Sequence, residues 1–165
     1  MSYTLVHISP GWLGLLGSPQ GLCRLVPPQP SRGEVLFCLR DYLAGAAPDS
    51  SPFEELLSRL KVYYGGQPVI FEDTLDLAAA TPFQRQVWGA ARRIPYGERR
   101  SYSWVAEGIG RPGAARAVGQ ALARNPVPII IPCHRVVTRG GRLGGFSYGQ
   151  VMKQYLLQIE VDARS

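Results

Sequence analysis

A cysteine and a histidine, Cys133 and His134, are adjacent at the end of an apolar run that begins at Asn125. A cysteine thiolate is a strong nucleophile, but an ordinary thiol has a pKa of about 8.5 and is mostly protonated at neutral pH. A base or a cation must therefore favour the thiolate, and His134 is the only histidine in the second half of the chain. The pair predicts nucleophilic cysteine chemistry, and a cysteine that only fills space in the core is the alternative.

The apolar run over residues 125–132 is typical of a buried strand. Neighbouring side chains on a strand point to opposite faces, so direct contact between Cys133 and His134 would require a turn.

The remaining cysteines indicate neither a metal site nor a disulfide framework. Cys23, Cys38 and Cys133 are the only three cysteines, none in a CxxC spacing, and His7 is the only other histidine. Four-thiolate zinc sites and disulfide scaffolds need more cysteines at shorter or paired spacings. We therefore expect reduced thiols, no metal and no cofactor.

The helix expected just before the run, from residue 114 to about 124, has two unlike faces at 100° per residue. The apolar face, expected to pack on the core, consists of Ala114, Ala117, Val118, Ala121 and Leu122. Arg116 and Gln120 lie on the other face among small residues, which let the helix backbone approach a bulky partner closely. Arg116 is therefore a candidate probe, and an ordinary exposed arginine on an alanine-rich helix is the alternative.

This helix is the second of a candidate helix-turn-helix, because a short helix over residues 102–107 and a glycine-containing turn precede it. Residues 81–165 carry thirteen Lys or Arg and four Asp or Glu, a net charge of +9, whereas residues 1–80 carry a net charge of −3. A basic, arginine-rich half indicates nucleic acid as the partner, and a solvated basic surface is the alternative.

The first 80 residues predict hairpins followed by helices. Apolar runs at residues 3–8, 12–16 and 22–26 alternate with turn residues, which is typical of hairpins. Leu36, Leu39, Tyr42 and Leu43 recur at helical spacing. A second helix is expected to start with a cap at Ser51 and to run to about Tyr64.

The same cap pattern at Thr81 starts a helix that should end before Ile94, and it sets the best domain boundary. We predict an α+β protein with two domains. Residues 1–80 form a small α/β domain with a mixed sheet and helices, and residues 81–165 form a mostly helical domain with the helix-turn-helix. The chain has 165 residues, long enough for a working core.

No apolar run approaches the roughly 18 residues of a membrane span, and the first residues lack a basic region followed by an apolar stretch. We expect a cytoplasmic protein with no membrane partner.

From Thr81 onward the sequence resembles the O6-alkylguanine-DNA alkyltransferases, which reverse alkylation damage in DNA directly. The motifs occur in that family's order and spacing over about residues 75 to 160. They are Thr81-Pro82-Phe83-Gln84-Arg85-Gln86-Val87-Trp88, Ile94-Pro95-Tyr96-Gly97-Glu98, Ser101-Tyr102, Ala114-Ala115-Arg116-Ala117-Val118-Gly119, Asn125-Pro126, Pro132-Cys133-His134-Arg135-Val136, Gly145-Phe146-Ser147 and a last helix with Lys153, Leu156, Leu157 and Glu160. The N-terminal half matches weakly.

The resemblance implies that Cys133 displaces the alkyl group from O6 of guanine, and less readily from O4 of alkylthymine, and keeps it. It further implies a relay from Cys133 through a bridging water to His134 and Glu160, similar in logic to hydrolase triads. By the same resemblance, Asn125 braces the turn around the cysteine, and Tyr102 donates a proton toward N3 of the leaving guanine.

The resemblance also implies contacts to DNA. Arg116 fills the gap left by an extruded nucleotide, on a helix presented with Gln120 to the minor groove. The backbone carbonyls of Cys133 and Val136 accept from the guanine amino group, Ser147 contacts O6, and Lys153 supports the site electrostatically. For Arg135 we expect a structural role rather than a DNA contact: it pairs with a carboxylate and holds the cysteine loop.

At Tyr148 many family members have glycine, so we expect a narrower pocket that accepts bulky groups such as benzyl less readily.

The implied partner is duplex DNA carrying O6-alkylguanine, bound by a protein that is monomeric in solution and able to assemble cooperatively on DNA. Two other functions compete with this one. The first is a helix-turn-helix protein or alkyl-lesion sensor that binds DNA without chemistry. The second is a cysteine hydrolase or acyltransferase, which would leave the Arg116 helix unexplained.

Overall fold

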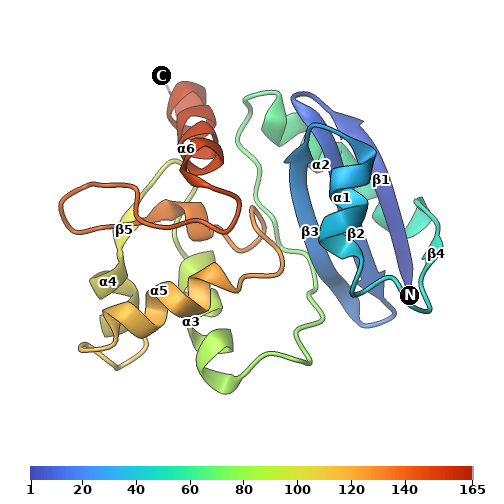
Figure 1. Cartoon of the computed structure of the whole chain (residues 1–165). Coiled ribbons are helices and arrows are strands. Elements are labelled where there is room, and N and C mark those ends of the chain that lie inside the picture. The colour runs from blue at the N-terminus through green and yellow to red at the C-terminus, as the bar shows by residue number, and fades with distance from the viewer. Residues whose placement is uncertain (165) are drawn as a thin grey trace. The chain divides into compact units, whose positions relative to one another are not determined.

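The computed structural model describes residues 1–164 and divides the chain into two compact units, Met1–Leu77 and Ala78–Ser165. Each unit has its own buried core. The fold is α+β, as predicted from the sequence, and Figure 1 shows the large sheet in one unit and most helices in the other. No helix within residues 1–164 is both long and apolar enough to cross a membrane.

The first unit contains a four-stranded mixed sheet in the order β3-β2-β1-β4. Its strands are β1 (Ser2–Ile8), β2 (Gly11–Ser18), β3 (Gly21–Gln29) and the short β4 (Ala47–Pro48). β2 pairs antiparallel with both β1 and β3, which confirms the predicted hairpins, and β4 runs parallel to β1.

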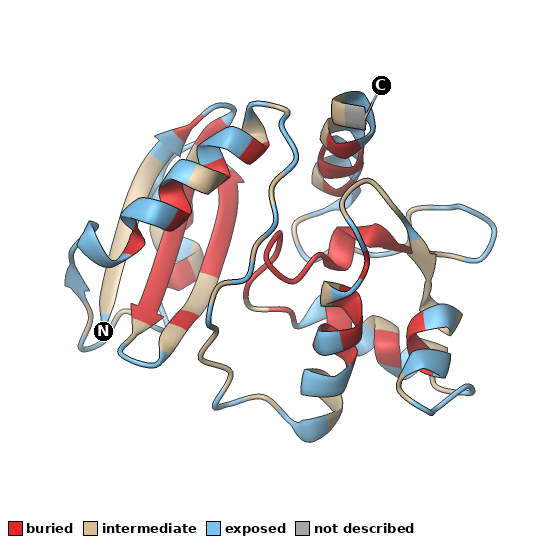
Figure 2. Cartoon of the chain, turned by 180° about the vertical axis from the view of Figure 1, so that it is seen from behind, coloured by how far each residue is buried: buried red, intermediate tan, exposed pale blue. Residues whose placement is uncertain are grey.

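Helices cover both faces of this sheet, so β2 is buried along most of its length (Figure 2). α1 (Arg32–Leu39) packs on β2 and β3 so closely that a Cβ at Gly14 would collide with the Val35 side chain. The turn η1 (Ser51–Phe53) leads into α2 (Glu54–Tyr64), and Phe53 lies against Gly17. Figure 1 shows α1 in front of the sheet and α2 behind it.

Two expectations for this unit are wrong in detail. α1 ends at Leu39, and Tyr42 lies beyond it, 40% exposed, with the Arg24 guanidinium 3.5 Å from its ring centroid. Ser51 does not cap α2, because its hydroxyl donates to Asp49 at 2.6 Å and a 3-10 turn precedes the helix.

The second unit positions the chemistry. It comprises α3 (Pro82–Arg92), β5 (Arg100–Ser101), α4 (Tyr102–Gly108), α5 (Ala115–Ala123), η2 (Cys133–Arg135), β6 (Val136–Val137) and α6 (Gln150–Arg164). The predicted capping box at Thr81 and Gln84 starts α3. Two parallel strands, β5 and β6, bring the segment before α4 beside the segment after η2. The Trp88 indole donates to the Ala121 carbonyl at 2.9 Å, which ties α3 to α5.

The predicted strand over residues 125–132 is wrong. The segment folds back on itself, since Ile131 N–H donates to the Val127 carbonyl at 2.9 Å and Ile129 has a φ of 78°. Burial explains the error, because an enclosed turn is as apolar as a buried strand. Ala117, expected on the packed face of α5, is exposed. It lies at the edge of the apolar face, and the buried residues of that face are Val118, Ala121 and Leu122.

Candidate active site

Cys133 is the first residue of the 3-10 turn η2 and is 5% exposed. The Asn125 amide holds it in place by donating to the Ile131 carbonyl at 2.8 Å and to Cys133 Sγ at 3.1 Å. Asn125 Oδ1 accepts from Val127 N–H at 2.8 Å. One buried side chain therefore fixes both ends of the turn and places an N–H donor on the sulfur.

Burial governs the protonation of Cys133. It raises the pKa of the thiol to about 11, although the hydrogen bond from Asn125 and the charge of Lys153 act in the opposite direction. The resting site therefore holds a thiol, and reaction requires a route for its proton.

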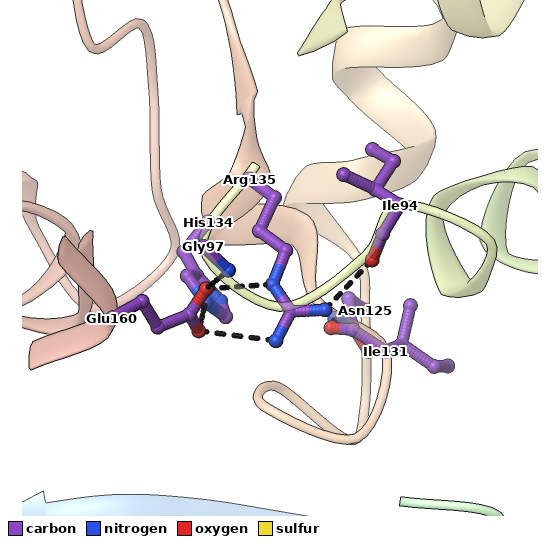
Figure 3. A network of polar contacts seen from close by, with 7 residues as sticks. All are labelled: Ile94, Gly97, Asn125, Ile131, His134, Arg135 and Glu160. Carbon is purple, nitrogen blue, oxygen red and sulfur yellow. Dashed lines mark hydrogen bonds and ion pairs between the residues drawn. The ribbon is translucent and has the colours of Figure 1, made fainter. Parts of the chain in front are cut away.

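His134, the residue after Cys133, forms a buried network with Arg135 and Glu160 (Figure 3). Glu160 Oε2 accepts from His134 Nε2 at 2.6 Å and from Arg135 Nη2 at 3.1 Å. Glu160 Oε1 accepts from Arg135 Nε at 2.8 Å and from the backbone N–H of Gly97 at 3.0 Å. Arg135 Nη1 donates to the Ile94 carbonyl at 2.8 Å. The carboxylate on α6 thus joins η2 to the loop after α3.

This network determines the charge and the tautomer of the His134 imidazole. Burial lowers the pKa of His134 despite the neighbouring carboxylate, so the ring is neutral near pH 7. Burial alone would raise the pKa of Glu160, but the hydrogen bonds from His134 and Arg135 outweigh it and hold the pKa well below its usual range. The carboxylate accepts from Nε2, so Nδ1 of the neutral ring is a proton acceptor. Nδ1 is buried and hydrogen-bonded to none of the residues described, 1–164.

A cavity of about 500 Å³ opens onto Cys133. One wall is α5, the other is the loop of residues 144–147, and Tyr102 lies between them. The lining residues are Tyr102, Ala115, Arg116, Gly119, Gln120, Leu122, Ala123, Cys133, Gly144, Gly145, Phe146 and Ser147. A space of this size and shape is ample for one flat heterocycle.

Side-chain hydrogen bonds to α6 and to the end of α5 secure the loop of residues 144–147. Lys153 Nζ donates to the carbonyls of Val136 at 2.8 Å and Gly145 at 3.1 Å. Gln150 Nε2 donates to the Gly144 carbonyl at 3.0 Å, and Ser147 Oγ donates to the Ala123 carbonyl at 2.6 Å. Burial lowers the pKa of Lys153 to about 8.

Gly144 is required where the loop meets Tyr102. Its φ is +73°, and a Cβ there would lie 2.5 Å from Tyr102 Oη. Burial raises the pKa of Tyr102, so its hydroxyl remains a proton donor.

The structure brings most residues singled out from the sequence together. Arg116, Gln120, Tyr102 and Ser147 line the cavity with Cys133, whereas Lys153 lies behind the wall. The Val136 carbonyl already accepts from Lys153. Tyr148 packs near Phe146, with ring centroids 6.4 Å apart, and Phe146 rather than Tyr148 lines the cavity. That Tyr148 narrows the pocket stays a prediction.

Sequence reasoning missed four participants. Phe146 lines the cavity, Gln150 pins Gly144, and the backbone of Gly97 and Ile94 completes the Glu160 network. Phe146 belongs to the motif Gly145-Phe146-Ser147, so the sequence does indicate it. The backbone partners carried none, because any residue type has an N–H and a carbonyl.

Within residues 1–164 no cluster of three or more His, Cys, Asp or Glu side chains could hold a metal ion, and the three cysteines are free.

Comparison with known proteins identifies relatives. A family model for the DNA-binding domain of 6-O-methylguanine DNA methyltransferase matches residues 82–161. The methylated-DNA–protein-cysteine methyltransferase of Mycobacterium leprae is 48% identical over 116 residues, 70% of each chain. That of Mycolicibacterium paratuberculosis is 41% identical over 146 residues, 87% of this chain and 88% of the relative. The crystal structure of Mycobacterium tuberculosis OGT in complex with DNA matches with a TM-score of 0.84 at 38% identity, covering 99% of this chain and 94% of that one.

Proposed function

The chain belongs to the methylated-DNA–protein-cysteine methyltransferase family, and on that premise we propose how it acts. It repairs duplex DNA by irreversible transfer of the alkyl group from O6 of an extruded alkylguanine to Cys133, once per molecule. The observation that carries this proposal is a buried thiol on the wall of a base-sized cavity, followed in the chain by a buried imidazole that a carboxylate orients. Residues 81–165 serve as the DNA-binding and alkyl-acceptor domain.

α5 delivers the base. O6 of a stacked guanine is out of reach of a protein thiol, so the nucleotide must leave the helix. Arg116 is exposed on α5 and lines the cavity beside Ala115 and Gly119, whose small size lets the helix enter the minor groove. Arg116 fills the gap in the base stack, and Gln120 lies one turn further along the same face.

The extruded base then displaces water from the cavity, and the thiol loses its proton. His134 Nδ1 takes that proton through one bridging water, while Glu160 stabilises the imidazolium that forms. Asn125 Nδ2 and the positive charge of Lys153 stabilise the thiolate.

The transfer itself is an in-line displacement at carbon. Sulfur forms a bond to the alkyl carbon, the bond from that carbon to O6 breaks, and its electron pair remains on the guanine. Tyr102 supplies a proton to N3 of the leaving base. The proton held by His134 then returns through solvent to the Tyr102 oxygen, so that both side chains regain their resting states. The products are a thioether on Cys133 and an unmodified guanine. Ser147 contacts O6 once its hydrogen bond to Ala123 is exchanged. O4 of alkylthymine reacts by the same steps, but less readily.

Mass spectrometry after mixing the protein with excess duplex containing one O6-methylguanine tests this proposal. We expect one added methyl group on the Cys133 peptide, saturating at one per chain and absent in Cys133→Ala. Selective binding of the lesion without added mass would indicate the sensor function instead. Repeated turnover of an ester or amide would indicate a hydrolase.

The protein is proposed to act as a monomer in solution, to assemble cooperatively on DNA, and to work in the cytoplasm, where it meets chromosomal DNA. Sedimentation of the free protein and of its complexes with duplexes of increasing length tests the first two points.

A further inference from the structure

The hairpin of residues 138–142 carries two arginines that have no part in the proposed alkyl transfer. It starts directly after β6 and leads into residues 144–147, which wall the cavity. Arg139 and Arg142 are both exposed. Neither guanidinium has an ion-pair or hydrogen-bond partner among residues 1–164.

The backbone beneath these arginines is well defined. Thr138 N–H donates to the Arg142 carbonyl at 2.9 Å, and Gly141 N–H donates to the Thr138 carbonyl at 2.9 Å. The Thr138 hydroxyl accepts from Arg142 N–H at 3.0 Å and donates to the Arg142 carbonyl at 3.2 Å. Gly141 has a φ of +81°, which favours glycine. Both arginines are therefore presented from an ordered turn.

Their positive charge is not compensated locally. Of the four acidic residues in residues 81–165, Glu98 pairs with Arg100 and Glu160 is buried with Arg135. Asp162 accepts from Gln158, and Glu107 is an exposed residue of α4. The hairpin itself contains no acidic residue.

The hairpin also lies next to the cavity in the chain, because it continues into residues 144–147. The cavity has α5 on one side and residues 144–147 on the other. The hairpin and the turn between α4 and α5 project toward the same side of the unit, left in Figure 1 and right in Figure 2. On the proposed function, a nucleotide that enters this cavity is flanked by backbone phosphates that reach its rims.

We propose that Arg139 and Arg142 bind two backbone phosphates of the duplex beside the extruded nucleotide, as a second DNA contact separate from α5. Guanidinium groups match phosphate oxygens in geometry and charge, and such contacts add affinity without reading sequence. The position of the extruded nucleotide rests on the proposed function. Binding of undamaged duplex does not require the chemistry.

The test measures how the affinity of the full chain for a labelled, undamaged duplex changes between about 50 and 200 mM salt. In Arg139→Ala/Arg142→Ala we expect weaker binding and a slope of log affinity against log salt that is shallower by about 2, about 1 for each lost phosphate contact. Arg139→Lys/Arg142→Lys keeps both charges and should retain most of the slope. It also covers the case in which the alanine variant does not fold.

Arg93→Ala/Arg99→Ala is the matched control, because it removes two exposed arginines elsewhere in the same unit. An unchanged slope in the hairpin variant, or an equal loss in the control, would overturn the inference. The proposed function fails separately, if the wild-type protein gains no methyl group on Cys133 from a lesion duplex that it binds.

Discussion

Glu160 sets the orientation of the His134 imidazole through its hydrogen bonds. Its two oxygens accept four hydrogen bonds, from His134, twice from Arg135, and from Gly97. Burial keeps the pKa of His134 below its ordinary value although the carboxylate raises it, and the charge of Arg135, which shares that carboxylate, acts in the same direction as burial. The imidazole is thus available as a base near neutral pH.

Replacing Glu160 by glutamine should destabilise the protein as well as slow alkyl transfer. The variant leaves the buried Arg135 guanidinium without its anion, which is expected to lower the free energy of unfolding by about 3–5 kcal/mol. Urea unfolding at pH 7 measures this loss. Glu107→Gln, on the exposed side of α4, is the control and should be near neutral. A loss no larger than in the control would contradict the role assigned to the network.

The raised pKa of Cys133 predicts its reactivity without DNA. Because only the thiolate reacts, alkylation of Cys133 by iodoacetamide should rise about tenfold per pH unit from neutral pH until the pH approaches about 11. Peptide mass spectrometry follows the rate, with Cys23 and Cys38 as internal references for general labelling. A plateau near pH 9 would show that burial does not control this thiol.

At the scale of elements, the site depends on segments without regular secondary structure. The turn before η2 is closed by one asparagine, and the cavity wall at residues 144–147 is pinned by side chains of α6. Both segments are irregular, yet side-chain hydrogen bonds hold each one from two or more sides. This bracing keeps the cavity shaped before DNA arrives.

Asn125→Asp separates the two functions of this residue. Aspartate retains the acceptor for Val127 N–H but replaces the donor to Cys133 Sγ with a negative charge. We expect a further rise in the thiol pKa and a slower transfer to Cys133, seen as a shift of the iodoacetamide profile to higher pH. Asn125→Ala should instead leave buried backbone groups unpaired, at about 1–3 kcal/mol each in urea unfolding. A downward shift of the profile in the aspartate variant would refute the donor role.

Gln150→Ala should loosen the cavity wall. Without its bond to the Gly144 carbonyl, residues 144–147 can move away from Tyr102, so the rate with O6-benzylguanine should increase relative to the rate with O6-methylguanine. Gln154→Ala, on the exposed side of the same helix, is the control. Single-turnover rates with both compounds give the ratio, and an unchanged ratio would show that this hydrogen bond does not set pocket width.

At the scale of the whole molecule, charge is divided between the units. Residues 81–165, which hold the cavity, carry +9, and residues 1–80 carry −3. A concentrated positive field attracts DNA to the unit that contains the thiol and raises the rate of encounter at low salt.

Stability should fall on the acid side of neutrality. The folded state lowers the pKa of His134 below its ordinary 6.5, so the unfolded chain binds more protons and stability decreases as the pH falls below 6.5. Glu160 has a folded pKa below its ordinary 4.5, so its contribution is present above pH 4.5 and is lost at lower pH. Denaturant unfolding should show a slope of at most about 1.4 kcal/mol per pH unit for each proton. A stability independent of pH between 7 and 4.5 would contradict the shift of His134, and a stability independent of pH below 4.5 would contradict that of Glu160.

The sequence alone determined features that neighbouring residues encode. The capping box at Thr81, the two helices around the 108–113 turn and the small residues beside Arg116 all follow from spacings of one to four positions. The same local pattern put Cys133 beside His134 and, through the family resemblance, indicated alkyl transfer to cysteine.

Only the tertiary structure decided which groups meet. Ile94, Arg135 and Glu160 are separated by 41 and 25 positions along the chain, yet they hydrogen-bond directly. The apolar residues 125–132 form a turn rather than a strand, because Asn125 supplies the hydrogen bonds that a neighbouring strand would have supplied. Composition records that a segment is buried, but the partners of its polar groups depend on contacts between segments distant in the chain.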